Sequence, residues 1–203
     1  MRGQRRPGRR AFVCRAHDLP PDGPISLSDI PGAGRLDLCC RVVTSGLLTS
    51  HGVRENAAVH LVVQDDLTVR FDGRSVRNLR PDERSTAARI RDALDAKDGA
   101  IGHQEAEPSP GVHVGRFGLA ATLSRLDGPL LHCHEVGTPL AEEPAPDDPT
   151  FVLSDHRDFT TAETDLLADR ADSRVSVGPE RLHADQTVTV AHNWLDTDGY
   201  RSY

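Results

Sequence analysis

Residues 150–179, TFVLSDHRDFTTAETDLLADRADSRVSVGP, contain a complete strand–helix–strand pattern. The run from Phe151 is short and apolar, as in a buried strand, and it ends at a polar turn. A helix is expected from Thr160, because Thr160 and Glu163 have the spacing of a capping box, in which each side chain satisfies a backbone donor of the first turn. Val175-Ser-Val-Gly-Pro179 is then a second strand that ends in a glycine loop. This alternation is typical of an α/β protein with a largely parallel sheet.

The same alternation extends upstream of this segment. Apolar runs predict strands at 11–16, 59–63, 68–71, 112–114 and 130–136, and helical spacing predicts helices at 36–51, 81–99 and 119–126. We therefore expect an α/β fold with a mostly parallel sheet and helices on both faces. The last segment, Thr187–Leu195 (TVTVAHNWL), is ambiguous: its β-branched residues favour a strand, whereas its position after a glycine-proline loop suits a closing helix.

Composition limits the class of protein. The chain has 203 residues, of which 37% are hydrophobic, enough for one good core. No stretch approaches the ~18 apolar residues of a membrane span, and no apolar secretory segment follows the arginine-rich start. We expect a soluble, cytoplasmic protein. The cysteines lack a C-x-x-C pair and are interpreted as free thiols: Cys14, Cys39, Cys40 and Cys133.

The charge distribution allows a nucleic-acid partner only at local arginines. The formal net charge is −7, yet residues 1–10 are strongly basic and are expected to form a mobile tail. Arginine suits phosphate and base contacts. The candidates around the first helix and the segments after it are Arg35, Arg41, Arg54, Arg70 and Arg84. A solvated arginine-rich surface is the alternative interpretation.

Two strand ends are candidate ligand sites. In open α/β sheets, ligands bind at the carboxyl ends of strands, here Leu153–His156 and Ser176–Pro179. Gly178 would allow a ligand to approach the backbone closely, since it has no Cβ. Two ordinary turns are the competing interpretation. The chain lacks the G-x-G-x-x-G and Walker lysine patterns, which argues against a Rossmann dinucleotide site or a P-loop.

Other polar groups are open to a structural interpretation. On a regular strand, His132 and His134 face one way and Cys133 the other, so the three are not expected to bind one metal ion. No G-x-S-x-G elbow supports a hydrolase. Asp37, at the start of a predicted helix, is either a partner of the helix dipole or a polar group presented to a substrate.

Six motifs in order along the chain carry a family resemblance. They are Ser28–Asp37 (SDIPGAGRLD), Ser50–Glu55 (SHGVRE), Val69–Gly73 (VRFDG), Pro81–Ser85 (PDERS), Phe151–His156 (FVLSDH) and His192–Asp196 (HNWLD). Together they strongly resemble the archaeal TrmY-type tRNA (pseudouridine(54)-N(1))-methyltransferases of the SPOUT superfamily. The likeness runs from about Ala11 to the end of the chain.

The resemblance implies a domain organisation and a cofactor. It implies a single SPOUT methyltransferase domain over 11–203, with residues 1–10 left as a disordered basic tail, and a trefoil knot in about 150–203 that binds S-adenosylmethionine. A homodimer is also implied. The positions that match the cofactor-binding loops are Leu153, Gly178, Leu182 and Thr187. Gln186-Thr187 replaces the His-Cys that is frequent in the family, which makes the Thr187 contact the least secure.

The resemblance also implies the reaction, methyl transfer to N1 of pseudouridine in the tRNA T-loop without a metal ion. Asp37 or Asp155 is the expected acceptor of the N1–H hydrogen bond. The expected RNA-binding residues are Arg35, Arg41, Arg54 and Arg84. Two alternatives remain: a related pseudouridine N1-methyltransferase that acts on ribosomal RNA, and a catalytically silent knotted RNA-binding module.

Overall fold

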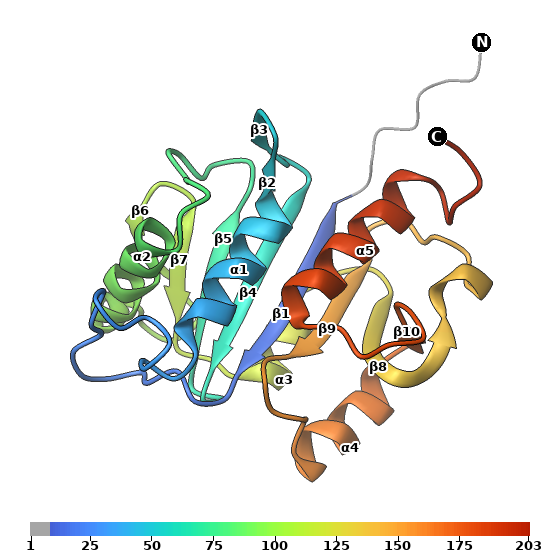
Figure 1. The fold of residues 1–203 in the computed structure, drawn as a ribbon. Helices are drawn as coiled ribbons and strands as arrows, with labels where there is room; N and C mark the ends of the chain where they lie inside the picture. Colours follow the sequence, from blue (N-terminus) through green and yellow to red (C-terminus); the bar gives the residue numbers. More distant parts are fainter. Residues whose placement is uncertain (1–8) are drawn as a thin grey trace.

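The computed structural model describes residues 9–203 (Figure 1). Residues 1–8 of the expected basic tail lie outside this range, and the first strand begins one residue earlier than expected, at Arg10. The strands of the main sheet are β1 (Arg10–Ala16), β4 (Ala57–Val63), β5 (Leu67–Asp72), β6 (Ala106–Ser109), β7 (Val112–Gly115), β8 (Leu130–Pro139), β9 (Thr150–Ser154) and β10 (Ser173–Ser176). Their order is β10-β8-β9-β1-β4-β5-β7-β6.

The sheet has a parallel part and an antiparallel edge. Strands β10, β8, β9, β1 and β4 pair in parallel, whereas β5, β7 and β6 are added antiparallel. Gln64 and Asp65, both with positive φ, form a tight turn that reverses the chain directly from β4 into β5. The expectation of a mostly parallel sheet is confirmed, and the short turn explains why its far edge is antiparallel.

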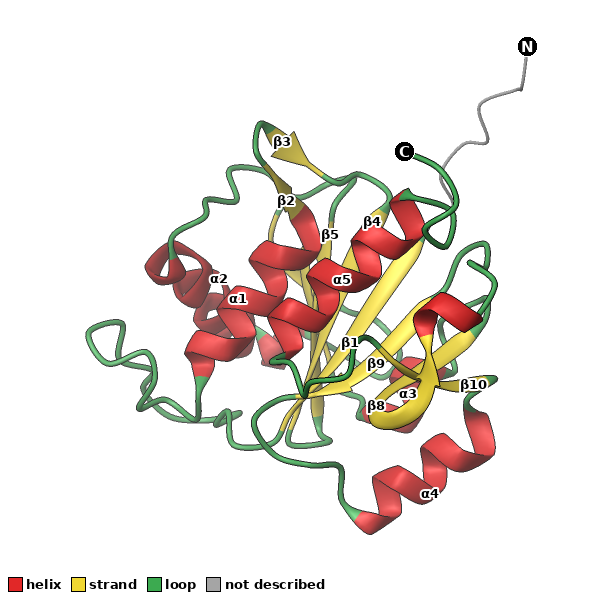
Figure 2. Cartoon of the chain, turned by 45° about the vertical axis from the view of Figure 1, so that its right-hand side comes forward, coloured by secondary structure: helices red, strands yellow, loops and turns green. Residues whose placement is uncertain are grey.

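Helices cover both faces of the sheet (Figure 2). On one face lie α1 (Leu36–Leu47), α2 (Glu83–Asp95) and α5 (Ala184–Asp196), and on the other lie α3 (Leu119–Leu123) and α4 (Thr161–Arg170). Two 3₁₀ turns, η1 (Lys97–Gly99) and η2 (Leu140–Glu142), complete the helical segments. No helix within residues 9–203 has the length and hydropathy to cross a bilayer.

Each central strand contributes side chains to two cores, because alternate residues point to opposite faces. On β1, Phe12 and Cys14 belong to the core under α1, α2 and α5, whereas Val13 belongs to the core under α3 and α4. The ring of Phe12 stacks on that of Phe151 in the neighbouring β9, with 5.4 Å between centroids. The four cysteines are free, as expected.

The ambiguous last segment is a helix. Val188, Ala191 and Trp194 recur at helical spacing in α5, and all three are fully buried in the core. The Gln186 side-chain oxygen accepts a hydrogen bond from the backbone N–H of His183 at 3.0 Å and so caps the helix start. Burial of one helical face therefore outweighs the strand propensity of the β-branched residues.

Several element boundaries differ from the sequence predictions. The first helix ends at Leu47 rather than His51, and the next residues form a small hairpin of β2 (Leu48–Thr49) and β3 (Gly52–Val53). Strand β6, which the apolar pattern did not predict, is short and polar and pairs only with β7 at the sheet edge. Edge strands need little apolar surface, so periodicity does not reveal them.

Candidate functional site

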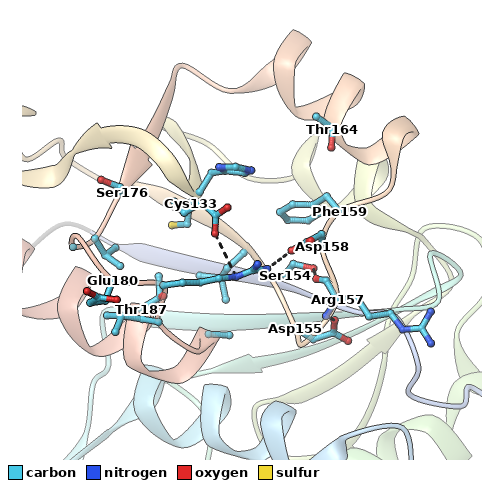
Figure 3. Close-up of a pocket in the computed structure, with 18 residues that line it drawn as sticks. Cys133, Ser154, Asp155, Arg157, Asp158, Phe159, Thr164, Ser176, Glu180 and Thr187 are labelled. Carbon is cyan, nitrogen blue, oxygen red and sulfur yellow. Dashed lines mark hydrogen bonds and ion pairs between the residues drawn. The ribbon is translucent and has the colours of Figure 1, made fainter.

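A cavity of about 240 Å³ lies at the carboxyl ends of β9 and β10 and beside β8. This volume is close to the ~300 Å³ lower end for small-molecule sites. Three segments form most of its wall: 133–135 of β8, 153–159 at and after β9, and 176–187 from the end of β10 into α5 (Figure 3). Thr164 of α4 also lines it. The cavity thus lies at both strand ends that the sequence singled out.

All four predicted cofactor-binding residues line this cavity. Leu153 contributes a buried apolar side chain at the end of β9, and Thr187 is a buried residue of α5. Leu182 lies in the loop between β10 and α5. At Gly178, an added Cβ would have no described atom within 4 Å, so the backbone there borders open space. The geometry brings these positions together from segments far apart in the chain.

Strand β8, which carries His132, Cys133 and His134, keeps the expected alternation at these residues: the rings of His132 and His134 lie on the same side, with 5.6 Å between their centroids. Between β10 and β8 the register jumps, so that Arg174 lies opposite His132 but Val175 lies opposite Thr138. Both Cys133 and His134 line the cavity. His132 is buried next to the ring of Phe159, at 5.3 Å between centroids. Within residues 9–203, no group of three His, Cys, Asp or Glu residues is arranged to hold a metal ion.

Asp155, one of the two predicted catalytic carboxylates, lies in the cavity wall with both oxygens occupied. Its Oδ1 accepts hydrogen bonds from the His17 ring at 2.9 Å and the Arg157 backbone N–H at 2.9 Å, and Oδ2 accepts from the His17 backbone N–H at 2.8 Å. Burial raises the pKa of Asp155, but these hydrogen bonds outweigh it and hold the pKa below its usual value. Such a carboxylate is a weak base.

Asp37, the other predicted catalytic residue, lies outside the cavity wall in an ionic cluster beside it. Arg35, with φ 60°, folds its guanidinium back on Asp37 with contacts of 3.0 and 3.1 Å, and Arg41 reaches Asp37 at 3.0 Å. Arg41 also lies 3.7 Å from Asp185, the neighbour of the cavity residue Ala184. Burial acts to raise the pKa of Asp37, and the two arginines lower it on balance.

The predicted RNA-binding arginines divide between two ends of the sheet. Arg35 and Arg41 lie in the cluster around Asp37, and Arg84 is exposed in the first turn of α2, next to Glu83, which contacts Arg41. Arg54 instead pairs with Asp196 at 2.8 Å, at the end of α5 and beside the start of β1. Seven residues of β1 separate the two ends by ~20 Å.

The fifth candidate, Arg70, lies on β5 in the antiparallel part of the sheet. Its guanidinium contacts Glu105 at 2.5 Å and Asp72 at 3.3 Å, so its charge is largely compensated by the protein itself. The solvated-surface interpretation of the arginines does not describe this residue, because its side chain is mostly buried.

Some charged residues of the site were missed at the sequence level. His17 and Glu163 form a buried network behind Asp155. Arg181, which lines the cavity, contacts Glu135 at 3.5 Å and also Asp158. A polar residue directly after a buried strand is the signal that could have identified His17, which follows β1. No comparable signal marks Arg181, since it lies in a loop.

The chain has extensive likeness to known proteins. A family model described as "Putative SAM-dependent RNA methyltransferase" matches residues 9–200. Proteins named tRNA (pseudouridine(54)-N(1))-methyltransferase are 62% identical in Halorubrum lacusprofundi, with 96% of this chain and all of that protein covered, and 44% identical in Methanopyrus kandleri, with 92% of each covered. The crystal structure of Archaeoglobus fulgidus Nep1 bound to S-adenosylhomocysteine has the same fold at TM-score 0.60 and 12% identity, covering 93% of this chain and 97% of that one.

Proposed function

The chain belongs to the family of putative SAM-dependent RNA methyltransferases, and on this premise we propose that it methylates N1 of pseudouridine 54 in tRNA. The family match and the names of close relatives support this activity. The observation that carries it is the cavity at the ends of β9 and β10, which brings together Leu153, Gly178, Leu182 and Thr187. These are the positions that the resemblance assigns to S-adenosylmethionine.

The lining of the cavity fits this methyl donor. Leu153 and Leu182 offer apolar surface for an adenine ring, and the open space at Gly178 leaves the backbone accessible to a nucleoside. The formal charge of the lining is negative, which favours a cationic ligand, because its carboxylates outnumber its two arginines, Arg157 and Arg181. The carboxylates are those of Glu135, Asp155, Asp158 and Glu180. The bound donor supplies a methyl group activated by a positive sulfur.

The residues of the chain have to align N1 of the base with the methyl group and allow the proton on N1 to leave. The bond from N1 to the methyl carbon forms as the bond from carbon to sulfur breaks, and the N1 proton leaves to a carboxylate or to water. Alignment of the two reactants can supply ~7 to 11 kcal/mol of the barrier, so a strong base is not required. This is consistent with the low basicity of both Asp37 and Asp155.

We assign the N1–H hydrogen bond to Asp37 rather than Asp155. Both oxygens of Asp155 are held by His17 and by backbone donors, whereas those of Asp37 are held by arginine side chains. Arg35 and Arg41 are partly exposed and can turn from Asp37 to RNA phosphates, which would release the carboxylate to the base. Arg84 would extend this positive surface. Arg54 would contact a different part of the tRNA.

Two further properties belong to the proposal. A trefoil knot over about 150–203 is supported by the path of the chain, which leaves β9, crosses through α4 to β10 on the far side of β8, and returns as α5 on the opposite face. A cytoplasmic homodimer is the assembly that the family resemblance implies, and light scattering on the purified protein measures it directly.

The activity is tested by incubating the protein with S-adenosylmethionine and pseudouridine-containing tRNA, then measuring 1-methylpseudouridine by mass spectrometry. Product in tRNA is expected. Fragments of ribosomal RNA are tested in parallel, and methylation of these fragments alone would show that the substrate is ribosomal RNA rather than tRNA. Failure to bind S-adenosylmethionine in calorimetry would reduce the chain to a silent RNA-binding module.

The role of Asp37 is tested by Asp37→Asn. A single-turnover rate at least ~10-fold lower is expected, equivalent to ~1.4 kcal/mol or more in activation free energy, with unchanged S-adenosylmethionine affinity. Asp92→Asn, an exposed carboxylate on α2 that pairs with its neighbour Arg91, is the matched control. An unchanged rate in Asp37→Asn would exclude Asp37 from the reaction.

A further inference from the structure

The ring of His17 lies between two carboxylates from different elements. Its Nδ1 is 2.9 Å from Oδ1 of Asp155, in the loop after β9, and its Nε2 is 3.0 Å from Oε2 of Glu163, in the first turn of α4. The side chain is 9% exposed, so solvent contributes little. The backbone N–H of the same residue also donates to Asp155.

Both contacts require that His17 donates. An ionised carboxylate only accepts hydrogen bonds, and a neutral imidazole has one N–H to donate. If the ring were neutral, one nitrogen lone pair would face a carboxylate oxygen at hydrogen-bond distance, which is repulsive. With Asp155 and Glu163 both ionised, the two distances are therefore compatible only with the imidazolium, which donates from both nitrogens.

The charges around this ring are consistent with a buried cation. Glu163 also accepts hydrogen bonds from Arg15 on β1 and from the backbone N–H of Thr160. Its pKa is lowered to about 2, because burial raises this pKa but the hydrogen bonds from His17, Thr160 and Arg15 outweigh the effect of burial. His156 is a further titratable neighbour, with Nδ1 3.6 Å from Asp155. Burial lowers the pKa of His17, but its contacts with Asp155 and Glu163 raise it on balance.

The two carboxylates belong to two walls of the cavity. Asp155 begins the loop that contributes Arg157, Asp158 and Phe159 to the lining, and Glu163 directly precedes the lining residue Thr164. The close-up shows Asp155 and Thr164 on separate segments around the cavity (Figure 3). His17 therefore lies between two segments that both contribute to the cavity wall.

We propose that His17 is a positioning residue, which as an imidazolium ties the loop after β9 to the start of α4 and so fixes two walls of the methyl-donor cavity. The inference rests on the proposed function, since it concerns binding of S-adenosylmethionine. His17 is not a catalytic residue in this scheme, because it acts through Asp155 and Glu163. Its deprotonation as the pH rises would loosen the cavity and weaken the binding of S-adenosylmethionine.

The experiment combines calorimetry with histidine NMR on the full chain. His17→Gln keeps one donor and lacks the charge, so its dissociation constant for S-adenosylmethionine is expected to rise at least ~10-fold at pH 7. The ratio of variant to wild-type constants should fall towards one as the pH rises and the wild-type ring loses its proton. This ratio cancels the titration of the ligand's own amino group.

Glu163→Gln separates the charge of His17 from its packing. It keeps the shape of the capping residue but removes one of the two negative partners, so His17 should lose its proton at lower pH and the affinity profile should shift with it. A purely structural role would leave the profile in place. In wild-type protein at neutral pH, the ring nitrogens of His17 should both carry protons in long-range ¹H–¹⁵N spectra; a neutral tautomer would overturn the proposal, even if His17→Gln fails to fold.

His113→Gln is the matched control. His113 on β7 also faces two carboxylates, Glu105 at 4.0 Å and Glu107 at 3.9 Å, but it is distant from the cavity in the antiparallel part of the sheet. The affinity of the His113→Gln variant for S-adenosylmethionine should equal that of the wild type. If wild-type protein does not bind S-adenosylmethionine, the proposed function fails; if it binds and His17→Gln binds equally well at every pH, only the role of His17 fails.

Discussion

Strand β1 has a buried histidine network at each end, and the two histidines differ in charge: one is a cation and the other is neutral. After its carboxyl end, His17 donates to two carboxylates and is a cation. At its amino end, His192 of α5 is 3.0 Å from the Arg10 guanidinium through Nδ1 and 2.9 Å from the Gly46 carbonyl through Nε2. One nitrogen therefore accepts and the other donates, which requires the neutral ring.

The difference shows that burial keeps a histidine neutral unless carboxylate partners outweigh it. Both rings are mostly buried, yet the pKa of His17 is raised by its carboxylates. Burial, reinforced by the charges of Arg54 and Arg10, lowers the pKa of His192 to about 3. The carboxyl end adjoins the cavity, whereas the amino end is closed by Arg10 and Asp196. We infer that one end serves binding and the other stability.

The largest expected effect is confined to the cavity end. Gly178→Val places a branched side chain in open space within the cavity, so the dissociation constant for S-adenosylmethionine should rise ~100-fold, or ~2.7 kcal/mol, while the melting temperature stays unchanged. Calorimetry and thermal unfolding measure the two quantities. Gly52→Val is the control, because it adds the same side chain at another open position in β3, where the nearest described atom is 3.8 Å away.

A substitution at the amino end of β1 should change only the stability of the protein. Arg10→Met removes the buried guanidinium that contacts both Asp196 and His192, so the free energy of unfolding should fall by ~2 kcal/mol in urea denaturation. The affinity of the folded variant for S-adenosylmethionine should match that of the wild type. A selective loss of donor binding would show that the two ends are not independent.

The two histidines should also give stability a pH dependence of opposite sign. The pKa of His192 is lowered to about 3 in the folded state, so between pH ~6.5 and about 3 the unfolded chain binds a proton that folded His192 does not. Stability therefore decreases as the pH is lowered through this range, by up to ~1.4 kcal/mol per pH unit. His192→Gln should reduce this slope. The pKa of His17 is raised, so its contribution is present in acid and is lost as the pH rises through the folded-state pKa. Urea midpoints across the pH range measure both slopes, and an unchanged acid slope in His192→Gln would refute the assignment.

The smallest effect is expected at the surface arginines. Arg84→Ala removes one exposed charge near the cavity end, so tRNA affinity should fall a few-fold and the salt dependence of binding should weaken by about one counterion. Arg54→Ala removes a charge from the other end, where Asp196 already compensates it, and should have less effect on tRNA binding. Filter binding at several salt concentrations compares the two; the reverse order would place the tRNA across the amino end.

Local patterns predicted most of the fold. Strands β1, β4, β5, β7, β8 and β9 were found at or near their expected positions, because each is a short apolar run with polar turns at its ends. The capping box of Thr160 and Glu163 also predicted the start of α4. Prediction failed where local signals are weak, as in the hairpin after Leu47 and the polar edge strand β6. Where the signals conflict, as in α5, the sequence left strand and helix open.

The alternation of strands and helices, the family and the loops that line the cavity could all be predicted from the amino-acid sequence, because they depend on short patterns and on motifs that follow in order. The tertiary structure was needed to show that Asp155 is held by His17, and that Arg54 pairs with Asp196 at the opposite end of β1 from Arg35. These contacts depend on strand order and register. They join residues more than a hundred positions apart in the chain, where no local pattern reaches.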